Sequence, residues 1–440
     1  MGIKGLIPFI RENAPKAVTV DVKQANYNGR VIAIDASTCL YQFMVAIRTG
    51  TGENYSNLTN DRGETTSHLS GFLNRTLKLL EAGAKPVYVF DGKAPSLKSG
   101  ELANRKARKQ QALEDYEKAK DEGDADKMQK MADRSVTVTR EMQEQTKKLL
   151  RLMAIPVIEA PCEAEATCAH FSKTGAAYAA ATEDADALCF GAKKLIRNLF
   201  TTDAKKRPTL EVDLQRVLEQ LDIDMNKFVD FCILSGCDYT DTIQKVGSIT
   251  AFQLIKQHGS IETALASGID KSRVPENFPF QEARDLFFKH EVTDVNEIDP
   301  ATGKKKCDFT AYYAAKPKPD TEGLKKLMIE ENQFADERIT KSIERLQKLL
   351  GQGTQLAFES FFTFQAPAIA AKDKFDPFKK KDGKKRANHL GALGKAAGAN
   401  PAKKRKGALT ADKLEAAGEN KENAGAGSSN ALPSGLFKDN

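Results

Sequence analysis

The sequence predicts an α/β protein with a mostly parallel central sheet that is flanked by helices. Short apolar segments alternate along the chain with longer segments in which apolar residues recur at helical spacing. The short segments are apolar throughout, as in strands that are buried on both faces of a parallel sheet. Acidic residues directly follow several of them, at the edge where the carboxyl ends of parallel strands meet.

Four strands are expected in this sheet, at residues 31–34, 86–90, 155–158 and 176–181. Helices are expected over 38–48 and 69–80, and a further helix should start near Glu163. More helices follow the fourth strand, including an apolar one over 228–234 and another over 250–258. Crossover connections between the parallel strands should be right-handed.

Two stretches differ in composition from the rest of the chain. Residues 98–135 are almost entirely polar and helix-favouring, which indicates either a solvated helix or an arch between two globular parts. Residues 366–440 are rich in Ala, Gly, Lys and Asn and are expected to form a disordered tail. This tail carries two basic runs, at 379–386 and 403–406.

The net charge of the chain comes from this tail. The 440 residues include 67 Lys and Arg and 60 Asp and Glu, which gives +7 at pH 7. Residues 366–440 hold 16 basic and 8 acidic residues, so the body keeps 51 basic and 52 acidic residues. Any non-specific attraction to nucleic acid should therefore come from the tail, whereas the body depends on where its charges lie.

Some classes of protein are excluded by simple patterns. No apolar run reaches the ~18–20 residues that cross a bilayer, and the N-terminus does not have the form of a signal peptide. The seven cysteines include no C-x-x-C pair, which favours a reducing compartment and argues against a zinc site.

Carboxylates follow the expected strands and the apolar helix over 228–234. They are Asp35, Asp91, Glu163, Glu165, Asp184, Asp186 and Asp238. Ligands of open α/β sheets bind beyond this edge, so these residues should converge on one cleft. Like charges at short range raise one another's pKa, and divalent cations relieve that conflict. Oxygen ligands favour Mg²⁺ or Mn²⁺, and seven of them suit two ions that clamp an in-line displacement at phosphorus.

The alternative for each single residue is a helix cap or a turn, which is the commonest role of an acidic residue after a strand. Glu163 and Glu165 do not share a face of a regular helix, so both reach one ion only at a loop-to-helix boundary. Lys98 and Arg105 lie seven residues apart in the polar stretch. On one helix face they would reach a scissile phosphate, and a solvated helix is the alternative.

Two further features indicate binding surfaces. Val246-Gly247-Ser248 precedes the helix over 250–258, and a glycine turn before a helix can present backbone amides to phosphate. An ordinary helix–turn–helix is the alternative. Gln355-x-x-Phe358-x-x-Phe361-Phe362 would place aromatic side chains in a groove of a partner, or would pack as a last turn on the body.

Taken together, the sequence motifs around these residues resemble those of the flap endonucleases in the structure-specific 5′-nuclease family. The matching segments are Met1–Leu6, Ala33–Ser37, Gly63–Leu69, Val87–Lys93, Leu97–Leu102, Pro161–Ala166 and Ala180–Asp186. The resemblance extends from residue 1 to about 362 and implies a PIN-like 5′-nuclease fold with a helical arch and a helix–turn–helix that binds DNA.

The resemblance also implies roles for single residues. The first Mg²⁺ would be held by Asp35, Asp91, Glu163 and Glu165, and the second by Asp184, Asp186 and Asp238. Catalytic roles would fall to Lys98, Arg105 and Asp184. DNA would be bound by Tyr41, which would stack on a base, and by Arg48, Arg75, Glu163, Gly236, Asp238 and Gly247. Gly2 would be the mature N-terminus beside the active site. The sliding clamp PCNA would be bound by Gln355, Phe358, Phe361 and Phe362.

The regions implied for the chain overlap in part. They are an N-terminal nuclease region (1–108), a helical arch (98–135), an internal nuclease region with the helix–turn–helix (126–257), the C-terminal part of the body (258–350), a clamp-binding motif (354–362) and the tail (366–440). Four positions depart from the family's pattern. Lys245 replaces a glycine and Ser248 a proline at the helix–turn–helix, Cys237 stands where a serine is common, and Phe358 replaces an aliphatic residue in the clamp motif.

The implied activity is that of a Mg²⁺-dependent 5′ flap endonuclease with 5′→3′ exonuclease activity, in Okazaki fragment maturation and long-patch base-excision repair. The implied cofactors are two Mg²⁺, replaceable by Mn²⁺, and a K⁺ at the helix–turn–helix. The implied partners are flapped duplex DNA and the trimeric clamp, with the chain as a monomer and no membrane. The implied location is the nucleus (nucleoplasm and nucleolus), and a mitochondrial location stays open.

Two other functions stay open. One is a mainly processive 5′ exonuclease of the same family, and the other is a non-catalytic scaffold for DNA junctions or for the clamp. Retention of all seven carboxylates argues against the scaffold.

Overall fold

The computed structural model describes residues 2–49, 56–199, 207–298, 300, 303, 305–352, 369–370 and 373–378. The chain divides into two units, Met1–Lys379 and Lys380–Asn440. All the elements below belong to the first unit.

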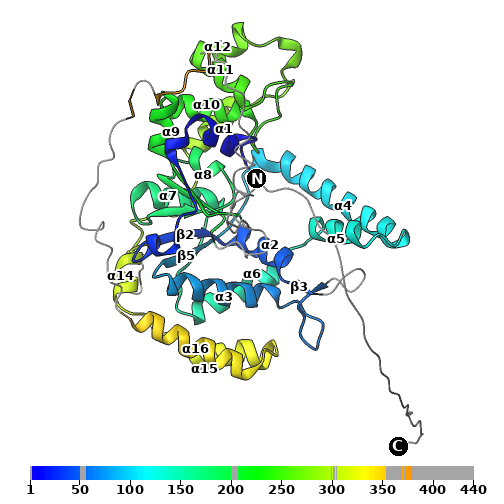
Figure 1. Ribbon diagram of the computed structural model, residues 1–440, viewed down its shortest axis with the longest axis vertical. Coiled ribbons are helices and arrows are strands. Elements are labelled where there is room, and N and C mark those ends of the chain that lie inside the picture. Colours follow the sequence, from blue (N-terminus) through cyan, green and yellow to red (C-terminus); the bar gives the residue numbers. More distant parts are fainter. Residues whose placement is uncertain are drawn as a thin grey trace, which may run out of the picture. The chain divides into compact units, whose positions relative to one another are not determined.

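A seven-stranded sheet forms the centre of this unit, in the order β1-β9-β8-β7-β2-β5-β6 (Figure 1). Its strands are β1 (Val18–Val20), β2 (Val31–Asp35), β5 (Lys85–Phe90), β6 (Val157–Glu159), β7 (Ala179–Ala181), β8 (Lys194–Arg197) and β9 (Leu210–Asp213). The five strands from β8 to β6 pair in parallel, and β9 and β1 add an antiparallel edge. The prediction of a mostly parallel sheet is confirmed. A separate two-stranded ribbon pairs β3 (Arg48–Thr49) with β4 (Ser56–Asn57).

The four predicted strands are β2, β5, β6 and β7, whereas the parallel strand β8 and the antiparallel edge of β9 and β1 were not predicted. The strands at that edge are short and only partly buried, so they lack the continuous apolar run of a central strand. By contrast, all five residues of β2 are buried, and Asp35 at its end pairs in register with Val89 of β5.

Two hydrophobic cores lie on the two faces of the sheet, because side chains alternate along each strand. In β2, Val31 and Ala33 join one core, whereas Ile32 and Ile34 join the other. The first core is covered by α1 (Leu6–Asn13), α7 (Ala164–Thr174), α8 (Asp186–Cys189), α9 (Leu214–Leu221), α10 (Met225–Ser235), α11 (Ser248–His258), α12 (Ile261–Ser267) and α13 (Phe280–Phe288).

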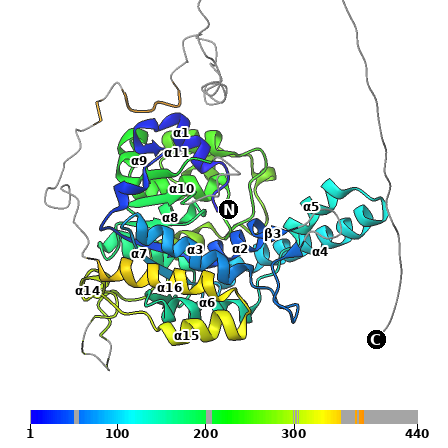
Figure 2. The same cartoon turned by 60° about the horizontal axis from the view of Figure 1, so that its bottom comes forward.

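The second core is covered by α2 (Ala36–Ala46), α3 (Ser67–Glu81), α6 (Arg140–Leu152), α15 (Thr321–Lys325) and α16 (Asp336–Gly351). A π-helical turn, Lys326–Glu331, continues α15. Figures 1 and 2 show the two sets of helices on opposite sides of the sheet. Helix α14 (Phe309–Ala314) contributes Phe309 to the first core and Tyr313 to the second. Short 3₁₀ turns lie at Pro15–Ala17, Gln24–Tyr27, Ser96–Lys98 and Lys271–Arg273.

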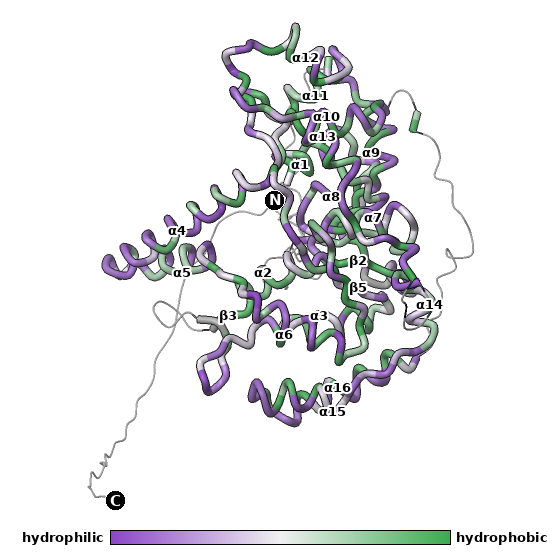
Figure 3. Tube along the Cα trace, turned by 180° about the vertical axis from the view of Figure 1, so that it is seen from behind, coloured by the Kyte–Doolittle hydropathy of each residue, from purple (hydrophilic) through white to green (hydrophobic). Residues whose placement is uncertain are grey.

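The polar stretch over 98–135 forms a helical hairpin of α4 (Ser99–Asp121) and α5 (Ala125–Arg134) that extends away from the sheet (Figures 1 and 2). Only Ala112 and Ala119 of α4 are buried, and Met128 of α5 is buried with them. Figure 3 shows that α4 is hydrophilic along most of its length. The alternatives of a solvated helix and an arch therefore describe the same structure.

The C-terminal region requires a correction. Residues 373–378 lie on the body, since the ring of Phe375 contacts Phe9 and Phe252. The predicted boundary of a disordered tail at residue 366 is therefore wrong for this short segment. The predicted clamp-binding residues Gln355, Phe358, Phe361 and Phe362 lie outside the described residues, so that motif stays a prediction.

Two findings bear on the classes of protein discussed above. All seven cysteines are free thiols, and six of them are buried. Across the described ranges, no helix combines the length and the apolar character that a bilayer span requires.

Candidate active site

The predicted carboxylates converge at the carboxyl edge of the parallel strands. Six of them line one cleft of about 1620 Å³, which also receives Lys98 and Arg105. The six are Asp35, Asp91, Glu163, Glu165, Asp184 and Asp238. The seventh, Asp186, is fully buried and donates its backbone N–H to Asp184 Oδ1 at 3.0 Å. The expected convergence on one cleft is what the structure shows.

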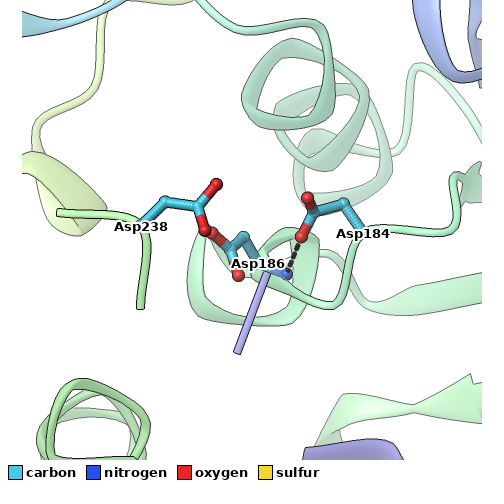
Figure 4. Close-up of side chains that lie close together, drawn as sticks. All are labelled: Asp184, Asp186 and Asp238. Atoms are coloured by element: carbon cyan, nitrogen blue, oxygen red, sulfur yellow. Dashed lines mark hydrogen bonds between the residues drawn. The ribbon is translucent and has the colours of Figure 1, made fainter. Parts of the chain in front are cut away.

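Asp184, Asp186 and Asp238 form the tightest part of this cluster. One carboxylate oxygen of each lies within 4.8 Å of the other two (Figure 4). Asp186 Oδ1 accepts the backbone N–H of Ile3 at 2.8 Å, but Oδ2 is buried and has no hydrogen-bond partner among the described residues. Burial, followed by the charge of Asp184, holds the pKa of Asp186 well above its ordinary range.

These observations fit a divalent cation. A buried carboxylate oxygen without a partner is costly, and a cation would both satisfy it and lower the raised pKa. The ligand atoms of Asp184, Asp186 and Asp238 are all carboxylate oxygens, which suit a hard cation better than zinc. The close packing of Gly2 supports the same site, because a Cβ there would lie 1.9 Å from Asp184 Oδ1.

Asp35 and Asp91 form a second part of the cluster. The side chain of Asp35 accepts hydrogen bonds from Thr38 of α2 and from Thr182 Oγ1, the latter at 2.8 Å. Burial, and then the charge of Asp91, raise the pKa of Asp35 to about 6. Asp35 is also the N-cap of α2, and Asp91 Oδ1 accepts the backbone N–H of Ala164 at the start of α7. Capping and membership of the cluster are thus compatible.

Glu163 and Glu165 reach the cleft from a loop-to-helix boundary, as their spacing requires. Helix α7 begins at Ala164, so Glu163 is its N-cap residue and Glu165 lies in its first turn. Both are nearly inaccessible to solvent. Burial raises the pKa of Glu165 well above its ordinary range, although the charge of Lys98 opposes the shift.

The ammonium group of Lys98 lies between three of these carboxylates and partly balances their charge. Its Nζ donates to Glu163 Oε1 and to Glu165 Oε1 (3.4 Å), and it lies 3.5 Å from Asp238 Oδ2. Burial alone would lower the pKa of the ammonium group, but the carboxylates outweigh burial and raise it. From the first turns of α4, Arg105 Nη2 donates to Asp238 Oδ2 at 2.5 Å. Both predicted cations therefore reach the cleft from the arch.

The predicted DNA-binding residues lie at several places. Tyr41 of α2 lines the cleft, is 39% exposed, and donates from its hydroxyl to the Asp133 carbonyl of α5. Arg75 of α3 lies over the ring of Phe43 at 4.4 Å and donates to Gln42 Oε1. Helix α2 therefore holds the guanidinium group of Arg75.

Three other predicted positions lie at the end of α10, at the start of α11 and in β3. Gly236 ends α10 with φ of 107°, and its carbonyl accepts the backbone N–H of Lys4. Gly247 is the N-cap of α11. The backbone of Arg48 lies in β3, and its side chain is outside the described residues.

Two residues that touch Glu163 were missed by the sequence reading. The hydroxyl of Tyr239 donates to Glu163 Oε2, and His290 Nε2 lies 3.5 Å from the same oxygen. Tyr239 directly follows Asp238 in the sequence, so its position gave a usable signal. His290 lies more than a hundred residues from its partner, and no local pattern marks it.

The departure at the helix–turn–helix has a structural consequence. Lys245 adopts φ of 60°, a left-handed conformation that favours glycine. The backbone therefore keeps the shape of a glycine turn although the side chain is lysine.

The fold and the acidic cleft are those of the XPG class of nucleases. The family model described as the XPG N-terminal domain matches residues 1–112, and that of the XPG I-region matches residues 154–238. Flap endonuclease 1-A of Oryza sativa subsp. japonica is 44% identical over 407 residues, which cover 92% of this chain and 100% of the relative. The chain belongs to the flap endonuclease family.

Solved structures agree with this assignment. Flap endonuclease-1 from Methanococcus jannaschii has a TM-score of 0.56 and 30% identity, over 76% of this chain and 96% of that one. The catalytic core of Rad2 in complex with DNA substrate has a TM-score of 0.56 and 24% identity, over 78% of this chain and 100% of that one, and it supports the fold alone.

Proposed function

We propose that this protein is a structure-specific nuclease that hydrolyses the phosphodiester at the base of 5′ flaps in branched duplex DNA. The proposal includes 5′→3′ exonuclease activity on the same substrates. It is carried by one observation: the buried carboxylates of Asp184 and Asp186 and the half-buried carboxylate of Asp238 lie together at a cleft that Lys98 and Arg105 also line. Membership of the flap endonuclease family supports the choice of substrate.

The proposed cofactors are two Mg²⁺ ions, which Mn²⁺ can replace. One would be held by Asp35, Asp91, Glu163 and Glu165, and the other by Asp184, Asp186 and Asp238. The raised pKa values of Asp35, Glu165 and Asp186 support this, because such buried carboxylates do not all ionise without added positive charge. When bound, the ions supply activation of water and stabilisation of the leaving oxygen.

Lys98 and Arg105 change partners in the proposed reaction. Here they neutralise Glu163 and Asp238. With bound cations beside these carboxylates, the ammonium and guanidinium groups would be free to donate to the scissile phosphate, where negative charge develops. Because Arg105 lies on α4, the position of the arch sets its distance from the reacting atoms.

Duplex DNA would be held next to this cleft through its backbone and its shape, without reading of base sequence. Tyr41 would stack on an unpaired base at the cleft. Arg48 and Arg75 would contact phosphates. The backbone amides at Gly247, where α11 begins, would contact another phosphate near a K⁺ ion, and Lys245 adds a positive charge there.

The proposed setting is DNA replication and long-patch base-excision repair in the nucleus, with a mitochondrial location open. The sequence of Gln355, Phe358, Phe361 and Phe362 supports binding of the chain as a monomer to the sliding clamp PCNA. The aromatic Phe358 is expected to weaken this binding relative to an aliphatic residue at its position.

A cleavage assay on a 5′-labelled flap substrate, with and without Mg²⁺, tests the proposal. Asp184→Asn keeps the oxygen that accepts the Asp186 N–H but removes the charge, so it should abolish cleavage while leaving flap binding largely intact. Asp285→Asn is the matched control, because its side chain is 67% exposed on α13, and it should cut at the normal rate.

The same assay separates the alternatives. Faster release of mononucleotides from a recessed end than cleavage of the flap would favour a processive exonuclease. Unchanged Mg²⁺-dependent cutting by Asp184→Asn would overturn the assignment of the metal site. Flap binding without any cutting by the unmodified protein would favour the scaffold.

A further inference from the structure

A short segment from beyond the last helix is docked on the body. This anchor segment, Asp373–Phe378, lies against α1, α9 and α11, on the face of the sheet opposite α16. Figure 1 draws it in orange beside α11. Nothing in the composition of the surrounding sequence, which is rich in Ala and Lys, predicts a docked segment there.

Phe375 joins three helices at the centre of the contact. Its ring centroid lies 5.4 Å from that of Phe252 in α11 and 5.9 Å from that of Phe9 in α1. Its backbone N–H donates to the carbonyl of Gln220 in α9 at 2.7 Å. The ring therefore packs against the first core while the backbone is fixed by a hydrogen bond.

With the segment in place, the side chain of Gln220 forms hydrogen bonds both to the body and to the segment. It is only 4% exposed, so each of its polar groups needs a partner inside the protein. Its Oε1 accepts the backbone N–H of Lys16, and its Nε2 donates to the carbonyl of Asp373. Without the segment, both this Nε2 and the backbone carbonyl that Phe375 uses would lose the partners described here.

Burial also alternates along the segment. Asp373, Phe375 and Pro377 are half-buried, whereas Lys374, Asp376 and Phe378 are exposed. The inward positions make the packing contact and the backbone hydrogen bonds, so the register of the segment in the groove is defined.

Two ion pairs also define that register, one with the negative charge on the segment and one with the positive charge on the segment. Asp373 Oδ2 lies 2.6 Å from Lys16 Nζ, and Lys374 Nζ pairs with Asp222. A segment shifted by one residue would bring like charges together. A third polar contact joins Gln253 Nε2 of α11 to the carbonyl of Pro377.

We propose that Asp373–Phe378 is a specific intramolecular ligand of the groove between α1, α9 and α11, and that it ties the stretch 353–372 to the body at both ends. Helix α16, which precedes the stretch in the sequence, packs on the second core, whereas the docked segment that follows it lies on the first core. If it binds the clamp, the clamp is held between two fixed points. This consequence rests on the proposed function, whereas the docking does not.

Amide hydrogen exchange of the full chain, followed by mass spectrometry, tests the docking. Phe375→Ala removes the central ring, so exchange over 373–378 should become at least about tenfold faster. Phe378→Ala is the matched control, since that ring is 57% exposed, and it should leave exchange unchanged. Exchange over α3, far from the groove, reports whether either variant has unfolded.

A charge exchange tests the register without removing the ring. Lys16→Asp and Asp373→Lys should each speed exchange of the segment, and the double variant should restore much of the protection. Three results would overturn the docking: exchange in the unmodified protein at the rate of an unstructured peptide, equal effects of the two phenylalanine variants, or a double charge variant no better protected than the single ones.

The consequence for the clamp has its own readout. Phe375→Ala should change the affinity for PCNA by several-fold while flap cleavage in the absence of the clamp stays the same. An unchanged affinity would refute the two-point attachment. If the unmodified protein does not bind the clamp, that result would instead count against the proposed clamp motif, and the conclusion from hydrogen exchange about docking would be unaffected.

Discussion

The acidic cleft and the arch contain the same kinds of charged residue in opposite environments. In the cleft, the side chains of Lys98 and Glu163 are 9% and 5% exposed. In the arch, the side chains of Lys118 and Asp115 are 66% and 36% exposed and lie 4.0 Å apart. Since Lys98 directly precedes α4 and Lys118 lies near its end, one helix runs from the cleft into solvent.

The difference between these regions is one of desolvation. Water screens the charges of the arch, so their number says little about stability. Water does not screen the buried carboxylates of the cleft in this way, so each of these requires a proton, a cationic side chain or a metal ion. The chemistry of the protein is therefore expected to depend on the buried charges, and the arch on its shape and on Arg105.

The largest effect on stability is expected from Lys98→Met in the metal-free protein. Removing the ammonium group leaves the carboxylates of Glu163 and Glu165 without their shared cation, which should cost about 3–5 kcal/mol of unfolding free energy. Lys118→Met removes an exposed cation of the same helix and should cost less than about 0.5 kcal/mol. Chemical denaturation in the presence of EDTA measures both.

Equal stability of the two lysine variants without metal would contradict the proposed difference between the buried charges of the cleft and the exposed charges of the arch. Saturating Mg²⁺ should narrow the gap, because bound cations replace the missing charge. A gap that widened with Mg²⁺ would show that Lys98 and the metal ions do not share the same carboxylates.

The next variant, Asp186→Asn, should lower the activity of the protein but raise its stability without metal. Asp186→Asn removes a buried charge and should lower flap cleavage by more than about 100-fold, which exceeds the usual effect of groups that only support a metal ligand. The same change should stabilise the metal-free protein by about 1 kcal/mol, because burial already disfavours the ionised carboxylate. Cleavage rates measure the loss of activity, and chemical denaturation in EDTA measures the gain in unfolding free energy.

A loss of both activity and metal-free stability would indicate that Asp186 is needed for packing instead. The backbone N–H of Ile3 donates to Asp186 Oδ1, and asparagine keeps that acceptor. The variant therefore tests the charge without removing the hydrogen bond.

A third prediction concerns pH. The pKa of Asp35 is raised to about 6 in the fold, against about 3.9 in an unfolded chain. The folded state then binds more protons between these values, so the stability of the metal-free protein should fall by on the order of 1–3 kcal/mol as pH rises from about 4 to about 6. Thermal unfolding in EDTA across this range measures the slope.

Mg²⁺ should change this slope, since the ion binds the ionised carboxylates. The stabilisation by Mg²⁺ should therefore grow as pH rises through about 6. A metal-free stability that rises over the same range would contradict the raised pKa of Asp35.

The sequence identified the cleft well because its carboxylates follow the strands that form the centre of the sheet. Asp35 ends β2 and Asp91 follows β5, and both strands are buried along their whole length. Topology then brings such ends together without further information. The helices over 38–48, 69–80 and 228–234 were predictable for a similar reason, because their apolar residues recur at helical spacing.

What the sequence missed depends on contacts between distant segments. Strand β1 becomes a strand only because β9 lies beside it, and its own residues are partly exposed. His290 reaches Glu163, and Phe375 reaches Phe9, across more than a hundred positions. The stretch around Phe375 and Phe378 is rich in Ala and Lys and contains no periodic pattern, so only its contacts with the groove reveal its role.

The smallest effect is expected at the turn before α11, where a surface lysine adopts an unusual backbone conformation. Lys245 has φ of 60°, which costs a residue with a Cβ about 1 kcal/mol or more relative to glycine. Lys245→Gly relieves this but gives the unfolded chain more freedom, so the net gain should be under about 1 kcal/mol. If the side chain contacts DNA phosphate, the same variant should weaken flap binding and reduce its salt dependence by about one counterion. Lys256→Gly would not serve as the control, since it lies within α11 and pairs with Asp222; Lys245→Gln keeps the strain and removes the charge. A gain in stability with Gly but not with Gln, and a loss of binding with both, would separate the backbone of this turn from its charge.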